Sequence, residues 1–340
     1  MLASLLQNTS SFDQSVKASH ILVVLPKLEK LPKKYDVPGE ESLNKLLVRR
    51  EMTLTDLTAT PVNANLPDGE LCAWVMIDTE RTVFEQQTAL RKAVKLLLAE
   101  GPVELHIAVY GSTQQRKNFS ELAVYVSWVN GAVLPVRKNK PARKPLARIF
   151  LYGYKDAGNF TLQRACAEGN LLARGLTALP ANELTPTTYR QQIKKLADSE
   201  GWKYQEYDLN KLREIGAGAF VAVAQGSDTE DAAIVHLQYQ CKQNSHPKTI
   251  AIAGKGICFD TGGHNLKPAR YMQGMHEDMN GSAVALGILL AATRAEIPIK
   301  IDCWLAIAQN HISPRAYKQN DIITALSGLS IEIVHTDAEG

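Results

Sequence analysis

The sequence lacks the features of a disulfide framework or a membrane protein. Its five cysteines are scattered and form no Cys-x-x-Cys pair, so we expect free thiols in a reducing compartment. There is no run of 18 apolar residues, and the N-terminus has no basic region followed by a long apolar stretch. The sequence therefore predicts a cytoplasmic protein without a membrane association.

A strong excess of charge is also absent. The 38 basic and 35 acidic residues leave a net charge of +3, which is too small to predict a nucleic-acid partner from the whole chain. The local exception is a proline-punctuated basic stretch at 137–148, with Arg137, Lys138, Lys140, Arg143 and Lys144. We interpret it as a solvated linker, with an anion or nucleic-acid patch as the alternative.

What the chain does have is apolar sequence in alternating patterns. Hydrophobic residues make up 45% of its 340 residues, which is enough for two domains with buried cores. Within residues 1–155, the β-branched segments 20–25, 71–77 and 104–110 predict strands, and 88–98 predicts an amphipathic helix. This alternation indicates an N-terminal α/β domain, with a domain boundary near residue 155.

The remaining residues, 156–340, predict a second α/β domain. A helix is expected over 162–179, and a second one begins after Thr185 as N-cap and ends at Gly201. The other expected elements are strands at 232–237, 249–253, 301–308 and 331–334 and a helix at 283–293. Together these segments predict a mixed β-sheet flanked by helices.

Four acidic residues of the second domain are candidate metal ligands: Asp260, Asp278, Asp337 and Glu339. We expect them in loops that follow strands 249–253 and 331–334, where open α/β sheets bind ligands. Four converging carboxylates would repel one another unless cations entered, and two divalent ions balance their charge. Zn, Mn and Mg all accept carboxylate oxygens, and Asp260 and Glu339 are our candidates to bridge two ions.

Two lysines accompany these carboxylates. Nearby dications would lower the pKa of Lys255 from its usual value of about 10.4, so that its neutral amine becomes a ligand. Lys267 is expected to stay charged and to stabilise an oxyanion.

Less specific interpretations apply to single motifs. An Asp-x-Glu after a strand is commonly a solvated turn. Segment 254–263 lacks the Gly-Lys-Ser/Thr ending of a phosphate loop. The histidines have no partner at a metal-site spacing and are expected to be structural or to contact the ligands: His264, His276, His311 and His335.

The combination of motifs is more specific than any one of them, and it resembles the leucyl aminopeptidase (cytosol aminopeptidase) family. The segments that carry the resemblance are Gly-Lys-Gly-x-x-Phe-Asp-Thr-Gly-Gly at 254–263, Lys267-Pro268, Met275-x-x-Asp278-Met279-x-Gly281 and Thr336-Asp337-Ala338-Glu339-Gly340. The resemblance is close over residues 165–340 and general before them.

The resemblance implies a role for each matching residue. Lys255 and Asp278 would hold one metal ion, Asp337 would hold the other, and Asp260 and Glu339 would contact both. Lys267 would be the catalytic lysine, and Met275 would line the pocket for the first side chain of the substrate. The implied activity is removal of a leucine-like N-terminal residue from peptides, with Zn or Mn as cofactor and water activated by the metal ions. The family also implies a homo-hexamer.

The sequence departs from the family pattern at three places. His335 stands where the family has Asn, and His276 stands where it has Lys or Arg. The family motif continues after Gly340 with an arginine that is thought to hold bicarbonate. We therefore expect this sequence to be a shortened version of a longer protein. The alternative function is a catalytically silent scaffold or DNA-binding relative, for which the basic stretch would be the binding surface.

Overall fold

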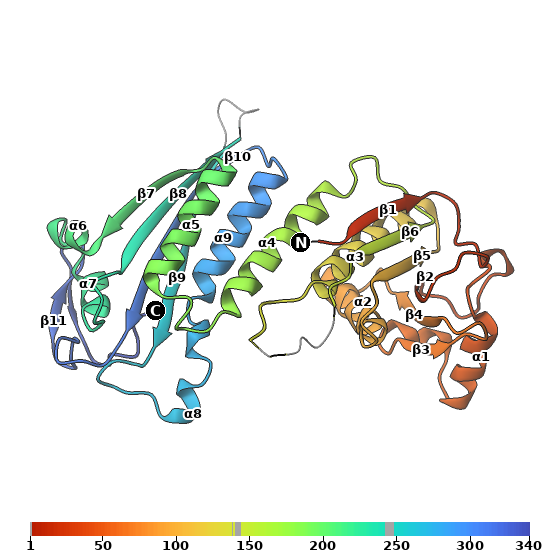
Figure 1. Cartoon of the computed structure of the whole chain (residues 1–340), viewed down its shortest axis with the longest axis horizontal. Coiled ribbons are helices and arrows are strands. Elements are labelled where there is room, and N and C mark those ends of the chain that lie inside the picture. Colours follow the sequence, from red (N-terminus) through yellow and green to blue (C-terminus); the bar gives the residue numbers. More distant parts are fainter. Residues whose placement is uncertain (1, 138, 140–143, 242–247) are drawn as a thin grey trace. The chain divides into compact units, whose positions relative to one another are not determined.

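The computed structural model describes residues 2–137, 139, 144–241 and 248–340. The chain divides into two compact units, one up to Ala167 and one from Glu168 to Gly340 (Figure 1). The division falls within helix α4 (Thr161–Thr177), and the expected boundary near residue 155 lies in the loop before it. In the basic stretch, residues 138 and 140–143 are outside the described residues.

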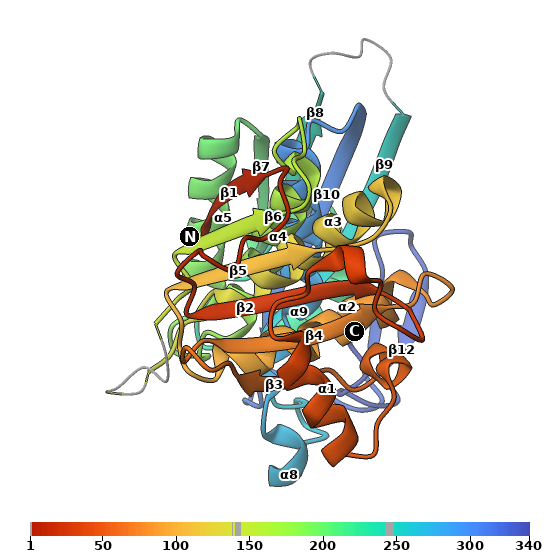
Figure 2. The same cartoon turned by 90° about the vertical axis from the view of Figure 1, so that its right-hand side faces the viewer.

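The first unit is built around a six-stranded sheet with the order β1-β6-β5-β2-β4-β3 (Figure 2). Its strands are β1 (Ser4–Asn8), β2 (His20–Pro26), β3 (Val62–Asn65), β4 (Leu71–Ile77), β5 (Glu104–Val109) and β6 (Arg148–Tyr152). All neighbouring pairs are parallel except β3 with β4. Every residue of β2 and β4 is buried, because helices and loops cover both faces of the sheet.

The long helices of this unit that precede α4 are α1 (Glu40–Arg49), α2 (Val83–Leu98) and α3 (Thr113–Gly131) among the described residues. Helices α2 and α3 pack on one face of the sheet and α1 on the other. Two of them begin with capping boxes, in which Thr82 pairs with Glu85 and Ser112 with Gln115. The unit is thus the α/β domain that the alternating pattern predicted.

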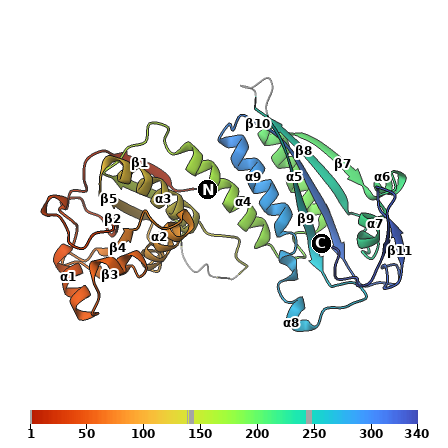
Figure 3. The ribbon, with the colours of Figure 1, turned by 180° about the vertical axis from the view of Figure 1, so that it is seen from behind.

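The second unit has a four-stranded mixed sheet with the order β7-β8-β10-β9 (Figure 3). The strands are β7 (Lys203–Asp208), β8 (Ala233–Gln240), β9 (Lys248–Asp260) and β10 (Ile299–Asn310). Strand β10 runs parallel to β9 and antiparallel to β8. Helices α4, α5 (Pro186–Glu200) and α9 (Asn280–Arg294) cover one face. Helix α7 (Gly218–Ala224), which follows α6 (Leu209–Glu214), packs on the other. The predicted mixed sheet flanked by helices is confirmed.

Local capping signals in this unit are also confirmed. Thr185 caps α5 through the backbone N–H of Thr188, and Pro186 occupies the first helical turn. Gly201 ends the helix in the left-handed conformation, with φ 72°. Among the described residues, no helix has both the length and the apolar character needed to cross a membrane.

The expected loop positions of the candidate ligands need two corrections. Strand β9 does not end at residue 253 but continues to Asp260, because β10 pairs with it that far; Lys255 and Asp260 are therefore strand residues. The strand expected at 331–334 is β12 (Ser330–Glu332), which pairs with β11 (Ile322–Thr324) in a separate two-stranded sheet. Two short elements, α8 (Ala269–Met272) and a 3-10 turn at Met275–Glu277, connect β9 to α9.

Candidate metal centre

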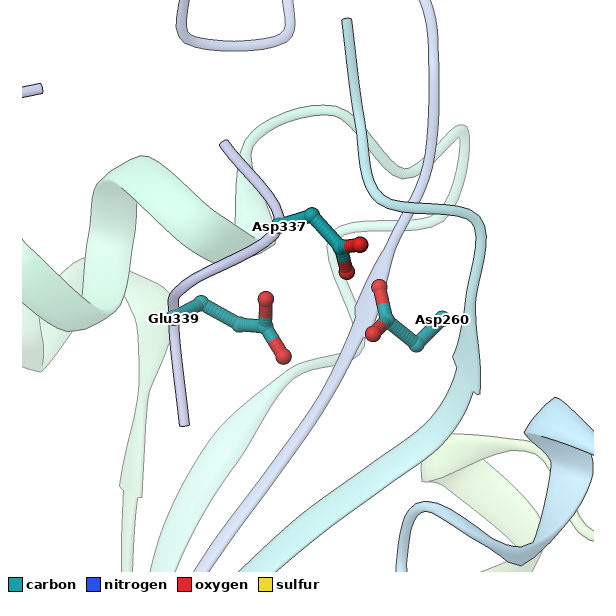
Figure 4. Close-up of side chains that lie close together, drawn as sticks. All are labelled: Asp260, Asp337 and Glu339. Atoms are coloured by element: carbon teal, nitrogen blue, oxygen red, sulfur yellow. The ribbon is translucent and has the colours of Figure 1, made fainter. Parts of the chain in front are cut away.

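Three of the predicted ligands converge on one point. Asp260 ends β9, and Asp337 and Glu339 lie in the segment after β12. Figure 4 shows their carboxylates directed toward one another, and one oxygen atom from each lies within 4.8 Å of the others. The side chain of Glu339 is only 2% exposed. Its Asp-x-Glu motif is therefore not a solvated turn.

Both predicted lysines lie in the same cluster, each between two carboxylates. The Nζ atom of Lys255 is 2.7 Å from Asp278 Oδ2 and 2.7 Å from Glu339 Oε1. The Nζ atom of Lys267 is 3.0 Å from Asp260 Oδ2 and also contacts Asp337. The structure thus brings together the six charged residues that the sequence predicted for the metal site.

The two ion-paired lysines hold their protons firmly. Burial disfavours the charge on Lys255, but the hydrogen bonds that its ammonium donates to Asp278 and Glu339 outweigh burial and raise the pKa of the amine above its usual value. The same balance, with Asp337 and Asp260 as partners, raises the pKa of Lys267. Burial, together with the nearby charges of Asp260 and Glu339, raises the pKa of Asp278 despite its lysine partner. Asp278 therefore lies among like charges that a nearby positive charge would offset.

A close approach between β9 and the start of α9 brings Lys255 near Asp278. A Cβ atom at Gly254 would lie 2.6 Å from the Cα atom of Ser282, and one at Gly281 would lie 3.1 Å from the backbone nitrogen of Lys255. Only glycine permits backbones to pack this closely. Asp278 lies just before α9 and so reaches the amine across the edge of β9.

A network of hydrogen bonds around Thr336 fixes the segment that carries Asp337 and Glu339. Thr336 is fully buried. Its Oγ1 donates to the carbonyl of Gly262 at 2.6 Å and accepts from the backbone N–H of Asn265 at 2.8 Å. Its own N–H donates to Asn265 Oδ1 at 2.8 Å, and its carbonyl accepts from the Tyr317 hydroxyl at 2.7 Å. The sequence places Thr336 in a motif, but no role for it was predicted.

The buried side chain of Asn310 was also missed, because no motif surrounds it. It lies at the end of β10, directly opposite Asp260 in the register. Its Nδ2 is 2.9 Å from Asp260 Oδ1 and 3.1 Å from the Thr336 carbonyl. Only pairing between distant strands brings these groups together.

The remaining candidates lie at the margin of the cluster. Met275 begins the 3-10 turn that precedes Asp278 and is partly buried. His335 accepts a hydrogen bond at Nδ1 from the backbone N–H of Asp337, at 3.1 Å. The Nε2 atom of His311 is buried, and among the described residues it has no hydrogen-bond partner. No histidine belongs to the group of converging ligand atoms found in the described part of the chain.

A pocket of about 470 Å³ adjoins Lys255 and Glu339 on the face of the sheet that α7 covers. Its walls are mostly apolar and include Phe220, Val223, Ile234, Ala253, Trp304 and Ala306. Apolar walls strengthen the interactions between the nearby charges, because they lower the local dielectric constant.

A mixed α/β sheet with carboxylates and lysines clustered at a strand end places the chain among α/β proteins with a carboxylate-rich site. The chain belongs to the cytosol aminopeptidase family, because the model of that family's catalytic domain matches residues 171–340. It is 45% identical over 177 residues to a probable cytosol aminopeptidase of Stutzerimonas stutzeri. It is 44% identical over 179 residues to the cytosol aminopeptidase of Pseudomonas aeruginosa strain PAO1. These matches cover 52% of this chain and 35% and 36% of the relatives, so the chain matches about a third of their length.

Solved structures show the same fold over nearly the whole chain. The bottromycin maturation enzyme BotP in complex with Mn is 25% identical, with a TM-score of 0.74 over 95% of this chain and 67% of that one. Leucyl aminopeptidase from Leishmania major in complex with actinonin is 21% identical, with a TM-score of 0.79 over 99% of this chain and 67% of that one. The latter likeness concerns the fold alone.

Proposed function

We propose that this protein is a metal-dependent aminopeptidase that removes a leucine-like N-terminal residue from peptides with a pair of divalent ions. The observation that carries the proposal is the convergence of Asp260, Asp337 and Glu339, whose oxygen atoms lie within 4.8 Å of one another. Family membership supports the reaction class. A relative with this fold bound to Mn supports the cofactor class.

The donor set fits two divalent ions. Four carboxylates carry four negative charges, and each lysine ammonium lies between two of them, at positions where cations are attracted. Two dications would balance the four charges and would also favour the neutral form of Lys255. Hard oxygen donors with one amine suit Mn or Zn.

Each residue then has a distinct role. Lys255 and Asp278 would hold one ion, Asp337 would hold the other, and Asp260 and Glu339 would contact both. When bound, the ions supply Lewis acidity that polarises a peptide carbonyl and makes water a stronger acid.

Two other residues act on the substrate in this proposal. Lys267 remains charged and donates hydrogen bonds to the carbonyl oxygen as negative charge develops on it. Met275 contacts the side chain of the N-terminal residue. From the family resemblance we extend the proposal to a homo-hexamer in the cytoplasm, with bicarbonate as an additional cofactor.

The test is hydrolysis of a leucine reporter amide by the full-length protein after chelation and metal addition. Chelation should abolish turnover, Mn or Zn should restore it, and an N-acetylated reporter should stay intact. Asp337→Asn should lower kcat/KM by about 100-fold or more. Glu332→Gln, an exposed change in β12, is the matched control and should have no effect. If the full-length protein is inactive both with Mn and with Zn, the proposal is wrong. The DNA-binding alternative stays a prediction, because residues 138 and 140–143 of the basic stretch lie outside the described residues.

A further inference from the structure

The side chain of Asn310 stands between the two carboxylates assigned to contact both metal ions. It is 1% exposed and ends β10. A β-bulge puts it there: Ala308 pairs with Ile257, but Asn310 pairs with Asp260, so β9 has one extra residue at this point. Regular pairing would place Phe259 opposite Asn310 instead. A bulge of this kind redirects a side chain, and bulges are common beside active sites.

Hydrogen-bond acceptors surround one end of the amide. The Nδ2 atom is 2.9 Å from Asp260 Oδ1, 3.1 Å from the carbonyl of Thr336 and 3.4 Å from Glu339 Oε2. Because all three neighbours are acceptors, the amino group and not the carbonyl must face them. One side chain thus contacts Asp260, Glu339 and the segment that precedes Glu339.

The lysines contact the other oxygen atoms of the same carboxylates. Asp260 Oδ2 faces the Nζ atom of Lys267 at 3.0 Å, and Glu339 Oε1 faces that of Lys255 at 2.7 Å. Asn310 therefore leaves one oxygen of each carboxylate directed at a cation while it contacts the second oxygen.

A purely structural role explains this side chain poorly. Its Oδ1 is buried and has no hydrogen-bond partner among the described residues, which lowers stability. Leucine has a similar size and would remove this unpaired oxygen, but it would also remove the three contacts of the amino group. The benefit of asparagine therefore lies in the contacts of its amino group.

We propose that Asn310 is a positioning residue that sets the orientation and separation of Asp260 and Glu339, and so determines how a pair of metal ions is bound. This inference rests on the proposed function. Residues that hydrogen-bond to metal ligands typically change metal affinity by about 10- to 100-fold when they are replaced.

The experiment measures Mn(II) binding to the full-length protein by calorimetry, together with the electron paramagnetic resonance signal of the coupled ion pair. In a folded variant, that signal would depend on how the carboxylates hold the two ions, so it would separate a change in their positions from a change in affinity alone. Asn310→Leu removes the donors at nearly the same size, and Asn310→Ala removes the donors together with most of the side chain, so neither variant adds a charge to the site. Gln309→Leu is the control, since its side chain accepts from Ser227 instead, at 3.3 Å.

We expect both Asn310 variants to bind the second ion about 10- to 100-fold more weakly and to lose or shift the coupled signal, whereas Gln309→Leu matches the wild type. If Asn310→Leu does not fold, as judged by circular dichroism, Asn310→Ala supplies the test. Wild-type affinities and an unchanged coupled signal in a folded Asn310 variant would overturn the inference and leave the proposed function intact. A wild-type protein without a coupled pair of ions would overturn both.

Discussion

Replacing Thr336 with valine tests the hydrogen-bond network that holds the C-terminal acidic segment. Valine has nearly the same shape, so the change removes the hydroxyl without opening a large cavity. Two partners lose their bonds: the carbonyl of Gly262, at 2.6 Å, and the backbone N–H of Asn265, at 2.8 Å. Because Thr336 is fully buried, the substitution acts on hydrogen bonds in the interior of the unit.

The expected cost follows from those two unpaired groups. A buried polar group without a partner costs about 1–3 kcal/mol. The bond from Asn265 is partly open to solvent, so water can replace some of that contact. We therefore expect the free energy of unfolding to fall by about 2–4 kcal/mol. Asp337 follows directly in the sequence, so we also expect weaker Mn(II) binding.

Urea unfolding measures the first effect, and calorimetric titration with Mn(II) measures the second. Thr249→Val, an exposed change in β9, is the matched control and should change stability by less than about 0.5 kcal/mol. A loss below about 1 kcal/mol for Thr336→Val, with Mn(II) binding unchanged, would refute the claim that its hydroxyl organises this segment.

Two further predictions concern packing and pH. Gly254→Ala should destabilise the protein strongly, because its Cβ would lie 2.6 Å from the Cα atom of Ser282. Gly175→Ala in α4 meets free space and should be neutral or stabilising. Thermal unfolding compares the two variants, and equal effects would contradict the packing argument. Burial lowers the pKa of His106, although the nearby charge of Glu104 acts to raise it. The folded state therefore takes up fewer protons than the unfolded state, so the free energy of unfolding falls as the pH drops below about 6.5. Urea unfolding at pH 7 and pH 5 measures this loss of stability, which should be smaller in His106→Phe. An equal loss in the variant would contradict the assignment to His106.

The structure follows the sequence most closely where local patterns act alone. Strand β4 is the predicted segment 71–77, and α5 has the predicted cap at Thr185 and the predicted end at Gly201. Those features depend on side-chain periodicity and on backbone preferences of single residues. Strand β1 was missed, because its short polar sequence has no clear alternation and gains its partner only from β6.

The sequence indicated which acidic and basic residues meet at the centre, because the combination of their motifs is more specific than any one of them. Their arrangement was not. The extension of β9 to Asp260, the bulge opposite Asn310 and the placement of β12 in its own small sheet depend on pairing between distant segments. Such pairing is decided by the packing of the whole unit, and no local pattern encodes which residue will face Asp260 across fifty positions of chain.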